Sequence, residues 1–299
     1  MKVKLSSGHE IYLDSYLVNA LDSLIYNVKN DWDFVIIITG DRMVRTGKSV
    51  LAINICAYLA DKLKTKYNLN NIFFDSQEMI DKVHDFPQYS VIHYDEGREG
   101  LAANKSGQQL QKDILDYFAE CGQLNHVFVV VLPDYFELKE NMAVARSECL
   151  INVYRNSREV EVDIYKDGQK KPVVKFDRGY FEFFNRDRKE SLYDRAKSTR
   201  RKSYSLIKAN FRGRFTNNYG PIDEEGYREK KRNALARFKE KKKEEHSAKA
   251  TDIFRDRLVL KCHNNGMVAR QIAKKLELEY DYKIGERRIQ QIIKKFKNP

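Results

Sequence analysis

The chain has little of what extracellular, fibrous and membrane proteins require. Its 299 residues include only four cysteines and five prolines, and no cysteines form a Cys-x-x-Cys pair. Neither a disulfide framework nor a zinc site is therefore expected, and the low glycine and proline counts exclude collagen-like and mucin-like chains. The N-terminus lacks an apolar signal segment, and no apolar run is long enough to cross a membrane. We therefore expect a soluble, cytoplasmic protein.

Charge is distributed unevenly along the chain. In total, 55 Lys and Arg residues stand against 43 Asp and Glu residues, which gives a formal net charge of +12. Residues 1–184 contain 22 of the basic and 27 of the acidic residues, a net charge of −5, so residues 185–299 carry +17. Such an asymmetry favours a protein in which one part performs chemistry and the other contacts a polyanion. A lysine-rich, soluble surface without a partner is the alternative.

Between residues 32 and 154, apolar runs alternate with amphipathic stretches. This is the pattern of an α/β domain in which helices flank a mainly parallel sheet. The runs are rich in Val, Ile and Phe, as in strands that are buried on both faces. We predict strands at 33–39, 71–74, 90–94, 126–132 and 149–154, and helices at 48–67, 77–85 and 107–122.

The pattern of apolar and polar residues changes after residue 155. Two alternating runs, at 159–165 and 173–184, flank an Asp-Gly turn and predict a β-hairpin that completes a domain over residues 1–184. Residues 185–250 show little apolar periodicity and many basic side chains. We predict a basic linker there that ends in a solvated, charged helix.

The strongest chemical signal is Gly47-Lys48-Ser49, which lies between a predicted strand and a predicted helix. At such a junction backbone N–H groups bind phosphates, the lysine reaches the β- and γ-phosphates, and the serine hydroxyl binds Mg²⁺. Six residues rather than four separate Gly40 from Gly47, and Arg42 occupies the position expected for the first glycine. Either the loop is two residues longer than usual, or its first turn forms without glycine. The predicted nucleotide-binding residues are Gly40, Arg45, Thr46, Gly47, Lys48 and Ser49, with ATP and Mg²⁺ as cofactors.

A second element supports this interpretation over a chance Gly-Lys-Ser sequence. The apolar run at 90–94 ends in Asp95-Glu96, 47 residues after Lys48. In P-loop ATPases a carboxylate at that strand end holds Mg²⁺ and its waters, and an adjacent glutamate polarises the attacking water. We therefore assign Mg²⁺ to Ser49 and Asp95 and the general base to Glu96. A water-activating glutamate favours hydrolysis over transfer to an acceptor, so we expect an ATPase.

Two polar residues near the later strands have open roles. Arg146 directly precedes the last predicted strand of the sheet and is a candidate catalytic arginine finger for a neighbouring subunit. A surface or salt-bridging arginine is an equal alternative. Asp134 follows the fourth predicted strand, where it would either sense the γ-phosphate or cap a loop.

Residues 251–299 regain helical periodicity in three pieces, at 253–264, 268–278 and 286–296. The part from residue 266 resembles a helix-turn-helix domain, because Ala269-x-x-Ile272-Ala273-x-x-Leu276 is the pattern usual in the first helix of the pair. Arg and Gln side chains on the third helix suit base edges, and the surrounding basic residues suit phosphates. A trihelical oligomerisation module is the alternative. The predicted DNA contacts are Arg270, Lys274, Lys275, Arg287, Arg288, Gln291, Lys294 and Lys295.

The first 155 residues resemble the ATPase core of the additional-strand, catalytic-glutamate division of P-loop NTPases. They are most similar to HerA/FtsK-type DNA pumps, zonula occludens toxin-like ATPases and viral DNA-packaging ATPases. The resemblance rests on Gly47-Lys48-Ser49, on Asp95-Glu96 and on Arg146-Ser147 before the next strand. It implies a homo-oligomeric ring, often hexameric, with double-stranded DNA in its channel, and an origin in a virus or mobile element.

Two functions of different classes follow from these features. The first is an ATP-hydrolysing DNA motor or remodelling protein of the translocation or packaging type. The second is an ATP-switched DNA-binding regulator, or a replication or partition factor, that does not translocate. A third hypothesis is that the basic C-terminal part binds RNA or an acidic protein.

Overall fold

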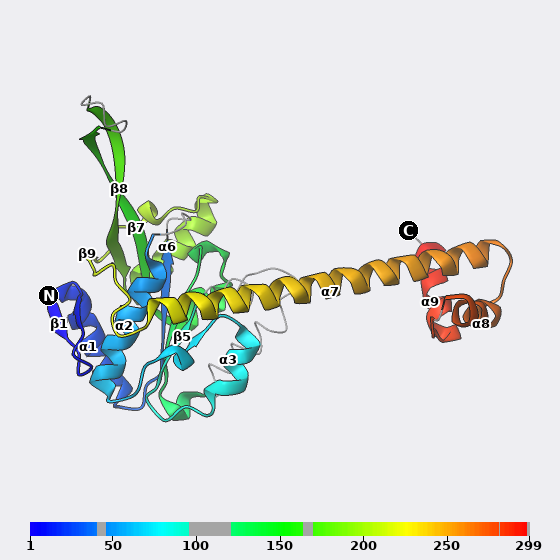
Figure 1. The fold of residues 1–299 in the computed structure, drawn as a ribbon, viewed down its shortest axis with the longest axis horizontal. Coiled ribbons are helices and arrows are strands. Elements are labelled where there is room, and N and C mark those ends of the chain that lie inside the picture. The colour runs from blue at the N-terminus through cyan, green and yellow to red at the C-terminus, as the bar shows by residue number, and fades with distance from the viewer. Residues whose placement is uncertain (41–45, 96–120, 164–169, 281, 298–299) are drawn as a thin grey trace. The chain divides into compact units, whose positions relative to one another are not determined.

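A computed structural model describes residues 1–40, 46–95, 121–163, 170–280 and 282–297. The chain divides into two compact units, Met1–Lys231 and Arg232–Pro299. The first unit is an α/β structure and the second is helical (Figure 1).

The first unit is built on a seven-stranded sheet of order β4-β5-β6-β3-β7-β8-β9. The strands from β4 to β7 in this order are parallel, whereas β8 and β9 are antiparallel to their neighbours. This mainly parallel sheet flanked by helices confirms the predicted α/β class. The strands are β3 (Phe34–Gly40), β4 (Ile72–Phe73), β5 (Val91–Tyr94), β6 (Val127–Val131), β7 (Ser147–Val162), β8 (Lys171–Phe184) and β9 (Phe211–Arg214), beside a small sheet of β1 (Lys2–Lys4) and β2 (Glu10–Tyr12).

Both faces of the sheet are covered. Along β3, Ile36 and Ile38 face one hydrophobic core, while Val35 and Ile37 face the other, as alternation along a strand requires. The helices of this unit are α1 (Ser15–Val28), α2 (Lys48–Leu63), α3 (Ser76–Val83) and α6 (Arg186–Thr199), with short helical turns η1 (Leu69–Asn71), η3 (Cys121–Leu124), η4 (Tyr135–Glu137), η5 (Asn141–Arg146) and η6 (Tyr204–Leu206).

The five strands predicted between residues 33 and 154 are present, as β3 to β7. Helix α2 ends at Leu63, four residues earlier than predicted, because Lys64 adopts a left-handed conformation that caps it. β7 runs unbroken from the predicted fifth strand into the predicted hairpin. The predicted helix at 107–122 falls largely outside the described residues, as does the Asp-Gly turn of the hairpin.

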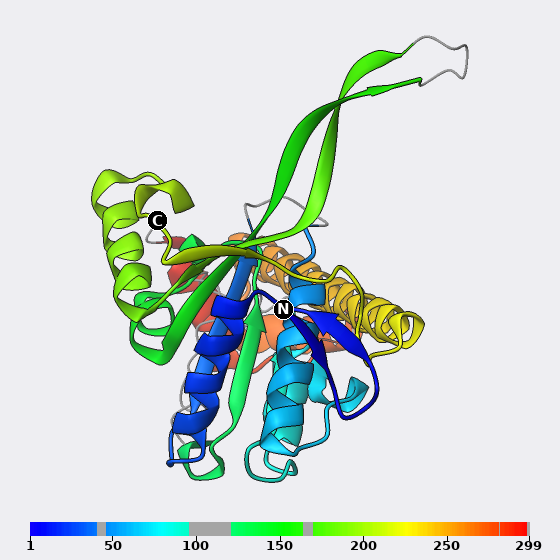
Figure 2. The ribbon, with the colours of Figure 1, turned by 90° about the vertical axis from the view of Figure 1, so that its left-hand side faces the viewer.

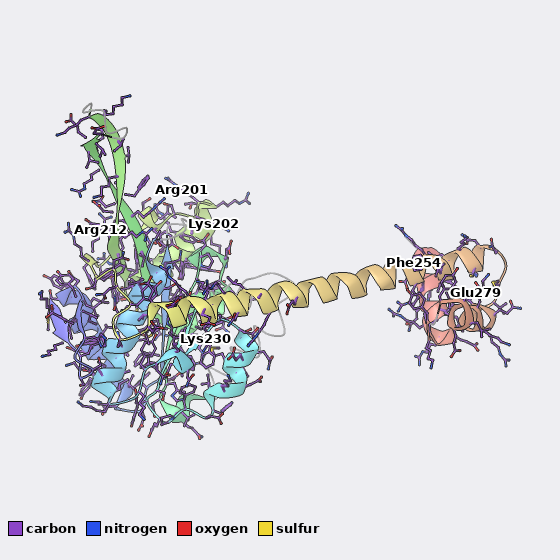
Figure 3. All side chains as sticks on the ribbon, in the orientation of Figure 1. Arg201, Lys202, Arg212, Lys230, Phe254 and Glu279 are labelled. Atoms are coloured by element: carbon purple, nitrogen blue, oxygen red, sulfur yellow. The ribbon has the colours of Figure 1, made fainter. Side chains whose placement is uncertain are left out.

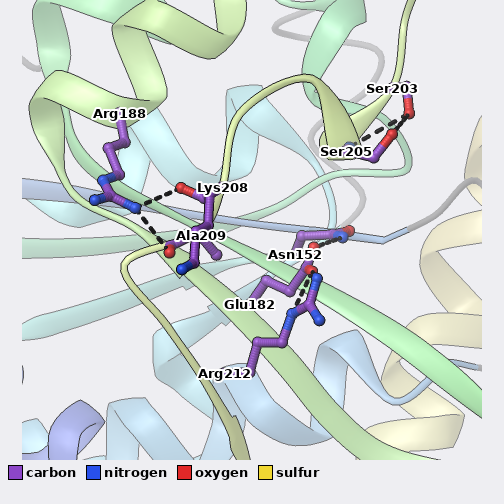
Figure 4. A network of polar contacts seen from close by, with 8 residues as sticks. All are labelled: Asn152, Glu182, Arg188, Ser203, Ser205, Lys208, Ala209 and Arg212. Atoms are coloured by element: carbon purple, nitrogen blue, oxygen red, sulfur yellow. Dashed lines mark hydrogen bonds and ion pairs between the residues drawn. The ribbon is translucent and has the colours of Figure 1, made fainter.

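The linker prediction is wrong as far as residue 231. Helix α6 and strand β9 lie in this segment, and both belong to the first unit. Polar contacts fasten the segment (Figure 4): the Arg188 guanidinium donates to the carbonyls of Lys208 and Ala209 at 2.6 and 2.8 Å, and Arg212 pairs with Glu182. These contacts are polar, so they add nothing to the apolar periodicity from which helices and strands are predicted.

A buried lysine on α6 holds this segment against η5. Lys189 is fully buried, and its Nζ donates to the carbonyls of Ala143, Val144 and Ser147 at 2.6–2.9 Å and to the Ser147 hydroxyl at 2.8 Å. Burial lowers the pKa of Lys189 to about 8. The ammonium thus satisfies carbonyls at the end of a helical turn that would otherwise lack donors.

Replacement of Lys189 by methionine is expected to lower the free energy of unfolding by about 3 kcal/mol, because it leaves several buried acceptors without a donor. Urea unfolding monitored by circular dichroism measures the change. The matched control is Lys197→Met, on the same helix, whose exposed side chain pairs with Glu140 at the surface and should matter far less. Equal unfolding midpoints for the two variants would contradict the structural role of Lys189.

The second unit contains the end of α7 (Glu224–Asn264) together with α8 (Ala269–Tyr280) and α9 (Glu286–Lys297). Its core consists of Val259, Cys262, Ile272, Leu276, Ile289 and Ile292. The last two predicted helices are confirmed. The predicted charged helix and the first helix of the C-terminal part are instead one continuous helix, α7, which begins in the first unit.

Two further properties of the described residues bear on the sequence analysis. Their helices include none with the length and apolarity that a membrane crossing requires. Cys56, Cys149 and Cys262 are buried free thiols.

Candidate functional site

The Gly-Lys-Ser sequence lies where α2 begins, after the end of β3. Gly47 immediately precedes the helix with a φ of 103°, in the left-handed region that favours glycine. A Cβ atom there would also lie 3.3 Å from the ring of Phe215. Lys48 and Ser49 form the first turn of α2, where backbone N–H groups have no partner within the helix. The start of α2 is therefore electropositive and suited to an anion.

The Lys48 side chain runs back across the end of β3. A Cβ atom on Gly40 would lie only 3.1 Å from Cδ and Nζ of Lys48, and 3.2 Å from Oγ1 of Thr46. Glycine at position 40 thus leaves room for the ammonium beside the strand. Thr46 is buried, and its Oγ1 has no hydrogen-bond partner among the described residues.

Asp95 reaches the same edge of the sheet from the end of β5. Its side chain is buried, and Oδ2 accepts a hydrogen bond from the Tyr227 hydroxyl and lies 3.8 Å from Nζ of Lys231. The Ser49 side chain also hydrogen-bonds to Asp95. Within the described part of the chain, Asp95 Oδ1 is buried without a partner. Among the described residues of this edge, Oγ1 of Thr46 and Oδ1 of Asp95 are therefore both buried oxygen atoms without a hydrogen-bond partner.

Asp95 is held in its charged form despite its burial. Burial raises the pKa of this carboxyl, but the Lys231 ammonium, His93 and hydrogen bonds from Tyr227 and Ser49 outweigh it, so the pKa lies below its usual value. Burial lowers the pKa of the neighbouring His93 to about 4. At neutral pH the site therefore contains a buried carboxylate beside a neutral imidazole.

A cavity of about 730 Å³ joins these groups and is large enough for a nucleotide-sized ligand. Its wall includes Lys48, Ser49 and Asp95, and residues from much later in the chain complete it. Four basic side chains and two acidic ones, Asp95 and Glu224, line the cavity, and this excess of positive charge favours an anionic ligand. The four basic side chains are Lys48, Arg178, Arg228 and Lys231.

The contribution of α7 to this cavity was not predicted from the sequence. The first turns of α7 supply Tyr227, Arg228 and Lys231 to its wall or to Asp95. Lys230, which is labelled in Figure 3, fixes these turns. Its Nζ donates to the carbonyls of Leu69 and Ile72 at 2.8 and 2.7 Å. An aromatic residue, Tyr227, within a charged helix was the only signal in the sequence.

The remaining predicted site residues of the first unit lie elsewhere. Arg146 is partly buried at the end of η5 and does not line this cavity. Asp134 accepts a hydrogen bond from the Phe136 N–H at 3.1 Å and so caps η4. Arg45 and Glu96 fall outside the described residues.

The residues at the cavity fit a hydrated Mg²⁺ that arrives with a phosphate ligand. No cluster of three His, Cys, Asp or Glu side chains that could hold a metal occurs in the described ranges. Magnesium needs fewer protein ligands, since it usually keeps several waters and binds one or two carboxylates together with substrate phosphates. The Ser49 hydroxyl and the unpartnered Oδ1 of Asp95 are oxygen donors of this kind.

The predicted DNA-contacting residues lie on α8 and α9 of the second unit. Arg287, Gln291 and Lys294 are exposed at intervals of four and three residues, so they share one face of α9. Lys275 is partly buried and lies 3.8 Å from Glu279. Arg270, Lys274 and Arg288 are also exposed, and the side chain of Lys295 is outside the described part.

Comparison with known proteins gives no family for this chain. No family model matches it, and a search of curated proteins finds no match either.

Proposed function

We propose that the first unit is a P-loop ATPase that binds MgATP at the carboxyl end of β3. The observation that carries this proposal is the meeting of Gly47-Lys48-Ser49, at the start of α2, with the buried carboxylate of Asp95 in one cavity. The position of β6 between β5 and β3 also supports the additional-strand division that the sequence resembles.

In this proposal the chain's own groups bind and orient the nucleotide. Backbone N–H groups at the start of α2 and the Lys48 ammonium contact the phosphates, while Ser49 and Asp95 hold Mg²⁺. When bound, Mg²⁺ neutralises charge on the phosphate oxygens. Glu96, the next residue after Asp95, orients and deprotonates the attacking water. Arg146 contacts the nucleotide of a neighbouring subunit.

For the second unit we propose a helix-turn-helix domain that binds double-stranded DNA. The exposed face of α9 carries Arg287, Gln291 and Lys294, side chains that suit base edges and phosphates. Joined to an ATPase, such a domain supports a cytoplasmic, homo-oligomeric DNA motor or remodelling protein of the translocation or packaging type.

Two contacts of α7 favour the alternative of an ATP-switched DNA-binding regulator. Helix α7 contacts Asp95 through Tyr227 and Lys231 and continues into the second unit. A nucleotide bound at Asp95 would therefore act on the first turns of the helix that leads into the DNA-binding part, and this requires no movement along DNA. Displacement of a protein roadblock from a duplex distinguishes the two functions, because a motor clears the block in the presence of ATP and a regulator leaves it in place.

The ATPase assignment is tested by Glu96→Gln. This variant is expected to lower DNA-stimulated phosphate release by about 100-fold, because the amide cannot accept a proton from water, while ATP binding persists. Phosphate release and titration of a fluorescent ATP analogue measure the two effects. Glu78→Gln on α3, which removes a surface pair with Lys82, is the matched control and should retain full turnover. Unchanged turnover in Glu96→Gln would exclude this residue as the base.

The DNA assignment is tested by the double variant Arg287→Ala and Arg288→Ala. We expect weaker binding to a duplex and a shallower salt dependence, by about one unit of log–log slope for each phosphate that the variant no longer neutralises. Fluorescence anisotropy over a series of salt concentrations measures both quantities. Lys261→Ala, on the exposed surface of α7, is the control. Duplex binding that ignores both salt and the two arginines, or a strong preference for RNA, would contradict the assignment.

A further inference from the structure

Strands β7 and β8 continue beyond the sheet as a two-stranded extension. Their pairing runs as far as Val162 and Lys171, whereas β9 accompanies β8 only from Phe183 to Tyr180. Figures 1 and 2 show this extension projecting from the first unit. We call its distal residues, 157–162 and 171–176, the arm. Most of their side chains are exposed, and Figure 3 shows them reaching outward along the extension.

One face of the arm is acidic and apolar. In the ladder of β7 and β8, Glu159 lies opposite Val174, and Glu161 lies opposite Pro172. These four side chains therefore lie on the same face of the arm. Phe176 shares this face, and both Val174 and Phe176 are more than half exposed, at 57% and 56%. At the base of the face, the Arg155 guanidinium stacks 4.6 Å from the Phe176 ring centre.

The opposite face of the arm is basic and apolar. In the same ladder, Arg158 lies opposite Lys175, and Lys171 lies opposite Val162, whose side chain is 41% exposed. The carboxylate of Asp177, at the base, lies 2.8 Å from Arg158. Like charges directly opposite each other destabilise a β-ladder. The juxtaposition of Arg158 and Lys175 therefore does not stabilise the arm when it is isolated.

We propose that the arm is an interface between copies of this chain, in which the acidic face of one arm packs on the basic face of a neighbouring arm. The two faces carry opposite charges, and each exposes one valine side chain, Val174 or Val162, that the contact would bury. A two-stranded ribbon without a covering layer is only marginally stable in water, and a neighbouring arm would supply that layer.

The contact joins unlike faces, so it is head-to-tail, and such contacts close into rings when the rotation between neighbours permits. The inference therefore rests on the proposed homo-oligomer and names the surface that forms it. A nucleic acid fits the arm less well, because Glu159 and Glu161 nearly balance Arg158, Lys171 and Lys175 in charge.

Charge exchange tests this interface. Glu159→Lys with Glu161→Lys makes both faces basic, and Lys171→Glu with Lys175→Glu makes both faces acidic. Either double variant is expected to lose the assembly that sedimentation velocity detects for the full chain. The quadruple variant reverses both faces and should assemble again, as should a mixture of the two double variants. The four side chains are exposed and lie outside the ATP cavity, so the fold and ATP binding should be unchanged.

Several outcomes would overturn the inference. Double variants that assemble like the natural chain would show that the arm is not the interface, and so would a quadruple variant that stays dissociated. A natural chain that is monomeric under all conditions would overturn it as well. If the Lys171→Glu and Lys175→Glu variant instead loses duplex binding and the quadruple variant does not regain it, the arm is a nucleic-acid surface. ATP binding, measured in parallel, separates failure of this inference from failure of the proposed ATP site.

Discussion

Replacement of Lys48 by alanine is expected to reduce ATP turnover by about 1000-fold and to weaken ATP binding. The Lys48 ammonium lies beside Gly40 at the end of β3, in the wall of the cavity, where it would meet the phosphates at the start of α2. Alanine is compatible with helix α2, but it lacks the positive charge that would neutralise negative charge on the phosphate oxygens during the reaction. Steady-state phosphate release and titration of a fluorescent ATP analogue provide the measurements.

Lys62→Ala is the matched control for Lys48, since Lys62 is an exposed lysine in the last turn of the same helix. Its loss should leave turnover unchanged. If Lys48→Ala retained the activity of this control, the phosphate site would have to lie elsewhere in the chain, and the assignment of the cavity would fall.

Asp95→Asn is also expected to lower ATP turnover by about 1000-fold, but through loss of Mg²⁺ binding and not through loss of a phosphate contact. The amide keeps the shape of the buried side chain but removes the negative charge that would hold Mg²⁺. The natural protein should bind ATP more tightly with Mg²⁺ than with a chelator. In Asp95→Asn this difference should disappear, while the weaker, Mg²⁺-independent binding through Lys48 remains.

The matched control for this substitution is Asp134→Asn, which keeps a side chain able to cap η4. It should retain the dependence of ATP binding on Mg²⁺. An Asp95→Asn protein that also retained this dependence would show that Mg²⁺ is held by other groups.

The central strands and the first half of the site could be predicted because their physical causes are local. β3 and β6 are buried on both faces, so their apolar runs are continuous and easily detected. Lys48 and Asp95 follow at the ends of such strands, where the carboxyl ends of a parallel sheet bring distant residues to one edge. The pattern therefore indicated both the elements and their meeting point.

The later half of the site could not be predicted, because distant polar contacts hold it in place. α6 is docked by the buried Lys189, and the first turns of α7 are docked by Lys230 on backbone carbonyls. In the sequence, these lysines cannot be distinguished from lysines that are exposed to solvent. Nothing local connects Tyr227 with Asp95, which lies 132 residues earlier.

The segment after β8 packs on the rest of the first unit, and its contacts determine how far the chain can be shortened without loss of the fold. A chain truncated after Phe184, where composition changes, would leave the outer edge of β8 without β9 and the carbonyls around Ser147 without Lys189. It would also remove Tyr227 and Lys231, which supply a hydrogen bond and a positive charge to the carboxylate of Asp95. Such a fragment is expected to aggregate through its bare strand edge, whereas one that extends through Lys231 retains the whole cavity wall.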